Sequence, residues 1–194
     1  MKTEKKSSTQ LRTELSKTKK ICVFGLLGAL SLVLSVFENL IFPSVPFLPA
    51  GAKVGLSNIV TMFAGSVFGF SGALYIALLK ALFAFVTRGA VAGAMSLSGG
   101  ILSVIVLSLI LMKERKTISF IGIGVLCAVF HNLGQLLCSC VLSGKAMLGY
   151  GKYLLLFAIV SGSFTGVVLN AVMPRLINLK ESEKTEFGLF QKTK

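Results

Sequence analysis

The sequence predicts an all-α membrane protein, folded as a bundle of six transmembrane helices. The chain of 194 residues is 54% hydrophobic and only 14% charged, whereas soluble domains are about one quarter charged. The mean hydropathy is +0.85. The hydrophobic residues form successive runs of about twenty, which is the length that a helix needs to cross a bilayer.

The chain divides into three parts. Residues 1–20 are basic and polar and predict a disordered cytoplasmic arm. The hydrophobic runs define a membrane domain at 21–175, and 176–194 form a cytoplasmic tail. The first run is too long for the hydrophobic region of a signal peptide, and further runs follow it, so we expect it to be retained. The six expected helices are 21–42, 53–69, 71–88, 94–112, 118–142 and 152–173.

The net charge of +13 reflects membrane topology rather than nucleic-acid binding. Seven Lys and Arg residues precede residue 21, three lie at 113–117 and five follow residue 174, which makes fifteen on one side. The other side has four: Lys53, Arg88, Lys145 and Lys152. Because cytoplasmic loops carry an excess of Lys and Arg, both termini are predicted to be cytoplasmic, in a multi-pass protein of the cell membrane. We expect the basic segments to contact the lipid bilayer. We expect no binding to nucleic acid.

Glu38 is the only acidic residue within the hydrophobic runs, and it lies near the end of the first one. An ionisable residue in a membrane segment is unfavourable unless it has a function or a partner. Glu38 shares one helix face with Ser31 and Ser35, and Asn39 lies beside it. A loop with three prolines follows, and the second expected helix begins at Lys53. We therefore expect Glu38, Asn39 and Lys53 to help bind a small molecule.

Polar residues in three further helices extend this candidate site. Asn58 and Thr61 share one face of the second helix. Lys80 lies in the middle of the third, where an ammonium facing lipid would be unfavourable, so Lys80 should face the bundle interior. His131 and Gln135 are four residues apart on one face of the fifth. This mixture of groups would suit a zwitterionic or partly anionic small molecule, and we expect no metal and no cofactor.

Each of these residues has a structural alternative. Glu38 and Lys80 could pair with each other as a lock between helices. His131 could be an interhelical hydrogen-bonding residue, and Lys53 and Arg88 could extend from helix ends toward the interface. The four cysteines all lie in hydrophobic runs, which favours small packing residues over a disulfide or a metal site.

Four segments of the chain carry a family resemblance. They are the first helix with Gly25, Gly28, Ala29 and a terminal Glu38-Asn39, the stretch PAGAKVGLSNIVT at 49–61, the lysine within LLKALF, and SLSGGILS at 96–103. Over about residues 18–176 the sequence resembles the Gx transporter family, which is also labelled heptaprenyl diphosphate synthase component I. That family is similar to the substrate-binding S components of energy-coupling factor (ECF) vitamin transporters.

The resemblance implies a six-helix S-component fold, with substrate held near the outer face by helix ends and a capping first loop. It also implies partners, a transmembrane T component and a pair of ATPases, because the chain has no Walker motif of its own. S components contact the T component through small residues at i and i+4 of the first helix. Gly25 and Ala29 match that spacing, with Gly in place of the usual Ala. The implied function is substrate binding in an uptake transporter.

The second family label names a synthase and gives an alternative function. Prenyl-chain synthases hold magnesium on a diphosphate with Asp-rich motifs, because hard cations need clustered carboxylate oxygens. The sequence contains no Asp and a single Glu within the hydrophobic runs. We therefore do not expect this chain to be an enzyme. The alternative is a non-catalytic accessory membrane subunit in polyprenyl diphosphate or menaquinone biosynthesis. A third possible class of function is a structural membrane scaffold, but a scaffold role does not explain why the ionisable residues Glu38 and Lys80 lie in membrane segments.

Overall fold

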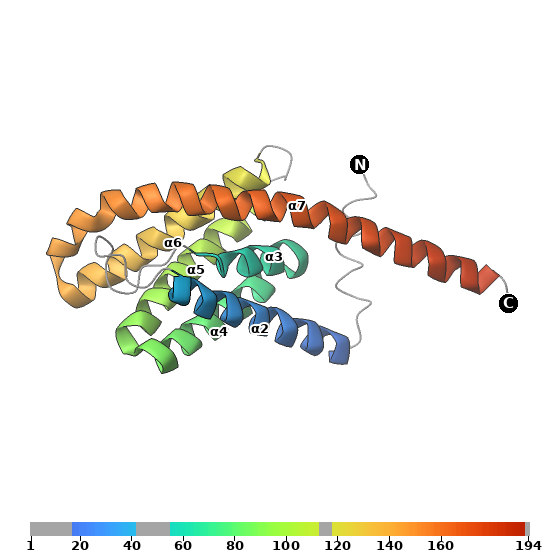
Figure 1. The fold of residues 1–194 in the computed structure, drawn as a ribbon, viewed down its shortest axis with the longest axis horizontal. Coiled ribbons are helices and arrows are strands. Elements are labelled where there is room, and N and C mark those ends of the chain that lie inside the picture. The colour runs from blue at the N-terminus through green and yellow to red at the C-terminus, as the bar shows by residue number, and fades with distance from the viewer. Residues whose placement is uncertain (1–16, 42–54, 113–117, 193–194) are drawn as a thin grey trace.

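The structure, a computed structural model, describes residues 17–41, 55–112 and 118–192. Within these ranges the chain forms six α-helices, one short 3-10 helix and no strand (Figure 1). The elements are α2 (Lys17–Ile41), α3 (Asn58–Phe68), α4 (Phe70–Arg88), α5 (Ala90–Met112), α6 (Phe120–Ser143), η1 (Lys145–Tyr150) and α7 (Gly151–Lys192). The prediction of an all-α membrane bundle is confirmed.

Five of these helices are long and hydrophobic enough to cross a membrane, and α3 is the exception. Its 11 residues span about 16 Å at 1.5 Å per residue, about half of the 30 Å hydrocarbon core. The predicted spanning helix at 53–69 is therefore wrong. Residues 55–57 form a turn, Gly55 has a φ of 93°, and the helix begins at Asn58. Residues 53 and 54 lie outside the described residues.

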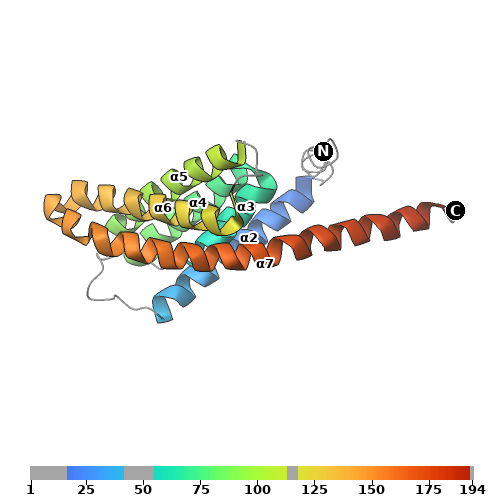
Figure 2. The ribbon, with the colours of Figure 1, turned by 90° about the horizontal axis from the view of Figure 1, so that it is seen from above.

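Two helix ends differ from the sequence expectation. The α2 helix begins at Lys17, inside the stretch predicted as a disordered arm, while residues 1–16 lie outside the described residues. The α7 helix continues to Lys192, through the predicted tail. Figures 1 and 2 show this last part of α7 extending past the rest of the bundle. The division of the chain into arm, membrane domain and tail stays a prediction.

Single glycines connect α3, α4 and α5. Gly69 separates α3 from α4 with a φ of 76°, and Gly89 separates α4 from α5 with a φ of 89°. These backbone conformations favour glycine because a side chain would clash with the backbone. The α3 helix packs against α4 across the first of these short connections. The next helix begins at Ala90 rather than at residue 94, so its connection is equally short.

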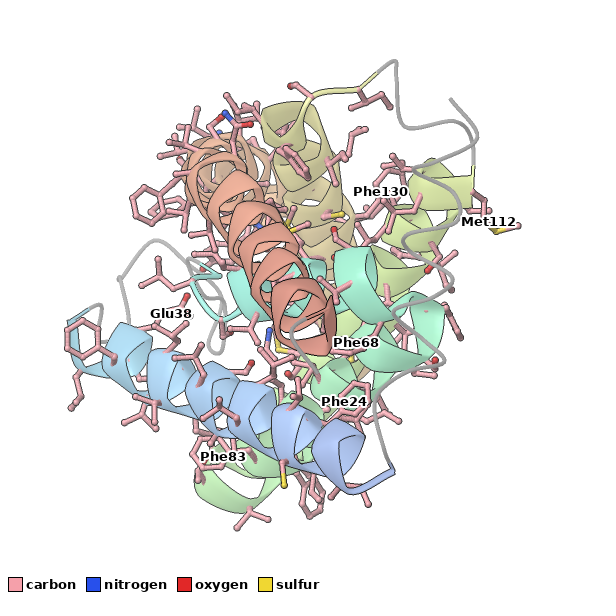
Figure 3. The ribbon with its side chains drawn as sticks, turned by 90° about the vertical axis from the view of Figure 1, so that its right-hand side faces the viewer. Phe24, Glu38, Phe68, Phe83, Met112 and Phe130 are labelled. Carbon is pink, nitrogen blue, oxygen red and sulfur yellow. The ribbon has the colours of Figure 1, made fainter. Side chains whose placement is uncertain are left out.

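The short α3 helix lies within the bundle and contacts four other helices, α2, α4, α5 and α7. Met62 of α3 belongs to a buried cluster with residues of α4, α5, α6 and α7, including Ala77, Leu107, Cys127 and Leu169. A second cluster joins α3 to α2 and α4; its members are Leu27, Val60, Ala64 and Ile76. The α2 helix lies at the edge of the bundle (Figure 3). The α2 helix therefore packs against both α3 and α4.

Glycines bring α6 and α7 into backbone contact. A Cβ atom added to Gly124 would lie 2.3 Å from the Gly162 carbonyl oxygen, and one added to Gly166 would lie 2.5 Å from the Ile121 Cα atom. Gly162 and Gly166 form the G-x-x-x-G spacing that lets membrane helices approach closely. Gly124, Gly162 and Gly166 are therefore packing residues between α6 and α7.

We predict that Gly124→Ala lowers the free energy of unfolding by at least about 1–3 kcal/mol, because the new methyl group meets backbone atoms that cannot rotate away. Unfolding of the purified protein in mixed micelles by sodium dodecyl sulfate measures this loss. Gly25→Ala is the matched control, since no atom of the described residues lies within 4 Å of its added Cβ. A helical Gly-to-Ala change in open space should stabilise by up to about 1 kcal/mol. Equal stability of the two variants would contradict the close packing of α6 and α7.

Candidate functional site

Glu38 is buried near the end of α2 and is 1% exposed. Ser31 and Ser35 are buried on the same helix, which confirms the predicted polar face. Figure 3 shows the Glu38 side chain pointing toward the beginning of α3. There Oε1 of Glu38 accepts a hydrogen bond from the backbone N–H of Gly55. The Glu38 carboxylate, which the sequence predicts to contact a ligand, thus connects α2 to the turn before α3.

The beginning of α3 needs such contacts, because the first N–H groups of any helix lack partners within the helix. Two of them are satisfied locally: the N–H of Asn58 donates to the Gly55 carbonyl (2.9 Å) and that of Ile59 to the Leu56 carbonyl (3.1 Å). The Glu38 carboxylate places negative charge near the positive end of the α3 dipole. Ser31 of α2 also donates from its hydroxyl to a backbone carbonyl in this turn, at Ser57 (3.4 Å).

Lys80 contacts the same short segment from the opposite side. It lies in α4, is 9% exposed, and its Nζ donates to Oδ1 of Asn58 at 2.5 Å. The prediction that Lys80 faces the bundle interior is confirmed. The segment Gly55–Asn58 therefore binds an anionic side chain through its backbone and a cationic side chain through Asn58. We call Glu38, Gly55, Asn58 and Lys80 the α3 site.

Arg88 adds a second cation near the α3 site. It is the last residue of α4, is half-buried, and lies within electrostatic range of the Glu38 carboxylate. The sequence expectation treated Arg88 as a residue extending toward the membrane interface. The structure adds an attraction between its positive charge and the Glu38 carboxylate.

His131 and Gln135 form a second polar pair, in α6. Both side chains are buried, and Nε2 of His131 lies 3.2 Å from Nε2 of Gln135, so their predicted shared face is confirmed. Gly99 of α5 makes room for them. A Cβ atom at Gly99 would lie 2.7 Å from the His131 carbonyl oxygen and 3.0 Å from Cγ of Gln135. The neighbouring Asn132 donates to the Leu154 carbonyl of α7 at 2.9 Å.

Two adjacent glycines of α5 relate this pair to the α3 site. Gly99 lies against His131, while a Cβ atom at Gly100 would lie 3.2 Å from Cβ of Ala77 in α4. Lys80 is three residues beyond Ala77, about one helical turn. The parts of α4 near Lys80 and of α6 near His131 therefore both pack against the Gly99-Gly100 part of α5.

The structure says less about the other residues that the sequence predicts to bind the substrate or a partner. Asn39 is partly buried on α2, and Lys53 lies outside the described residues. Gly25 and Ala29, the predicted partner contacts, are both exposed on α2. Sequence reasoning missed Gly55, whose role is played by its backbone N–H. The pair Ser57-Asn58 was an available signal, since Ser and Asn are preferred residues at helix beginnings.

Comparison with protein families gives one match. The family described as heptaprenyl diphosphate synthase component I matches residues 27–172, from the first turns of α2 to the membrane part of α7. Comparison with curated proteins and with solved structures gives no match. The matched segment contains the whole α3 site and the His131–Gln135 pair and covers most of the chain. The protein therefore belongs to the heptaprenyl diphosphate synthase component I family.

Proposed function

We propose that the protein is the substrate-binding membrane component, or S component, of an ECF-type uptake transporter for a small molecule. The α3 site carries this proposal. Glu38 and Lys80 are buried within a bundle whose helices are otherwise hydrophobic, and ionisable groups at such depth are typical of substrate and ion sites. A helix that is too short to span the membrane places polar backbone groups beside them, which is typical of membrane proteins where the backbone lines a site.

Small residues of α5 support one pocket. Gly99 lies against His131 of α6, and Gly100 lies against Ala77 of α4, about one turn before Lys80, so α4 and α6 both pack closely on this part of α5. We propose that the α3 site and the His131–Gln135 pair contact the same substrate, together with Asn39 and Lys53. In this proposal the chain binds the substrate and performs no chemistry on it.

The exposed face of α2 supports a partner in the membrane. Gly25 and Ala29 are exposed, and within the described part of the chain no atom lies within 4 Å of a Cβ added to Gly25. Small residues four apart let a second helix approach closely. We propose that this face contacts a T component, and that partner ATPases supply the energy. The excess of Lys and Arg at the termini supports an orientation in the cell membrane with both termini in the cytoplasm.

The family name favours a second candidate, a non-catalytic accessory subunit in polyprenyl diphosphate or menaquinone biosynthesis. The absence of aspartate from the sequence argues against magnesium-diphosphate chemistry in this chain itself. The two candidates differ in the expected partner. A transporter component associates with membrane and ATPase subunits, whereas an accessory subunit associates with a prenyl synthase.

We predict that Gly25→Leu and Ala29→Leu each weaken association with the transporter module, because the larger side chain keeps the partner helix at a distance. Affinity purification from native membranes, with quantification of the co-purified subunits, measures this. Ala171→Leu is the control, since Ala171 is a small exposed residue on α7. Recovery of a prenyl synthase, with no T component or ATPase, would contradict the transporter and favour the accessory subunit.

We predict that Glu38→Gln and Lys80→Met each strongly reduce the amount of co-purified small molecule, with modest loss of stability, and that the double variant recovers no binding. A purely structural pair behaves differently: each single change leaves a buried charge and is destabilising by about 3–5 kcal/mol, and the double change restores much of it. Mass spectrometry of bound molecules and thermal unfolding separate the two cases. Unchanged binding, with stability lost in both singles and regained in the double, would exclude the pocket.

A further inference from the structure

The α3 site contains a carboxylate oxygen that the fold leaves without a donor. Oε1 of Glu38 accepts from the N–H of Gly55, but Oε2 is buried and accepts no hydrogen bond from any residue in the described part of the chain. A buried charged acceptor without a donor is unfavourable. Arg88 lies within electrostatic range of Glu38, yet it does not donate to Oε2.

Thr61 of α3 has a hydroxyl group that is also buried. Its Oγ1 atom makes no hydrogen bond with any donor or acceptor among the described residues. Thr61 is three residues after Asn58, so the two lie on one face of α3, about one turn apart. Glu38 contacts the turn that immediately precedes Asn58. One unpartnered atom, Oε2 of Glu38, therefore belongs to a side chain that contacts the turn before α3, and the other, Oγ1 of Thr61, lies about one turn into that helix.

These observations point to the chemistry of the ligand. A carboxylate oxygen only accepts hydrogen bonds, and a hydroxyl oxygen accepts as well as donates. The best complement to a buried carboxylate is a cationic N–H group, because hydrogen bonds between opposite charges are the shortest and strongest. We infer that the substrate carries a cationic nitrogen, such as an ammonium group or a protonated nitrogen heterocycle, that donates to Oε2 of Glu38.

This inference rests on the proposed function and narrows it. The sequence alone suggested a zwitterionic or partly anionic molecule, because it gives Lys80 and Glu38 equal weight. In the structure Lys80 donates to Asn58, whereas one oxygen of Glu38 has no donor among the described residues. Glu38 therefore selects for a cationic group, and Thr61 offers a second polar contact to the same molecule.

The test uses the full chain in lipid nanodiscs and propylammonium as a probe. Binding is measured by saturation-transfer NMR, with empty nanodiscs to subtract partitioning into lipid, and with 1-propanol and propionate as neutral and anionic analogues. The wild type should bind propylammonium more tightly than either analogue. Glu38→Gln should weaken propylammonium binding at least about tenfold, because it removes the charge from a charge-assisted hydrogen bond. Its amide oxygen can still accept from the Gly55 N–H, so the beginning of α3 is preserved.

Lys152→Met, which removes an exposed cation of α7, is the control and should leave propylammonium binding unchanged. Thr61→Val tests the same site if Glu38→Gln does not fold, and it too should weaken binding. Equal affinity in the wild type and in the folded Glu38 or Thr61 variants, or equal affinity for propylammonium and 1-propanol, would overturn the inference.

Mass spectrometry of the molecule that co-purifies with the wild type separates this inference from the proposed function. A bound small molecule without a basic nitrogen would refute the cationic substrate and leave the transporter component intact. A bound small molecule with a basic nitrogen, lost in Glu38→Gln, supports both. If the wild type carries no small molecule and does not bind propylammonium, both fail.

Discussion

The beginning of α3 is the constraint on which the rest of the structure depends. A helix of 11 residues cannot span a bilayer, so its first turn lies inside the bundle. Backbone N–H and C=O groups at that depth must be satisfied by protein, because lipid offers no hydrogen bonds. Glu38 supplies an acceptor to Gly55, Ser31 donates to Ser57, and Lys80 binds Asn58. Glu38 and Lys80 thus lie where they stabilise the beginning of the short helix.

The same arrangement relates the two faces of α2. Its inner face carries Ser31 and Glu38 to the α3 site, and its outer face exposes Gly25 and Ala29. Glu38 is thirteen residues beyond Gly25, or about 20 Å along one continuous helix. The α2 helix therefore connects the α3 site to this exposed face of small residues through one continuous element. By contrast, α6 and α7 are fixed to each other through Gly124, Gly162 and Gly166.

Much of the fold could be predicted from the sequence. Hydrophobic runs located the five long helices, and helical spacing placed Ser31, Ser35 and Glu38 on one buried face. The burial of Lys80 followed from its unfavourable position in lipid. The length of α3 was missed because its run of hydrophobic residues continues backward past Asn58, while the turn at 55–57 is set by tertiary contacts. A backbone donor such as Gly55 cannot be found by counting side chains.

The most direct test is an NMR measurement of the Gly55 backbone amide, its chemical shift and its exchange rate with water, in the wild type and in Glu38→Ala. The account predicts a wild-type Gly55 amide that is shifted downfield and exchanges slowly with water, and that loses both properties in the variant. The Gly89 amide, which donates to the Phe85 carbonyl at 3.0 Å, should be unchanged. A Gly55 amide that exchanges equally fast in both proteins would contradict the attachment of α3 to Glu38.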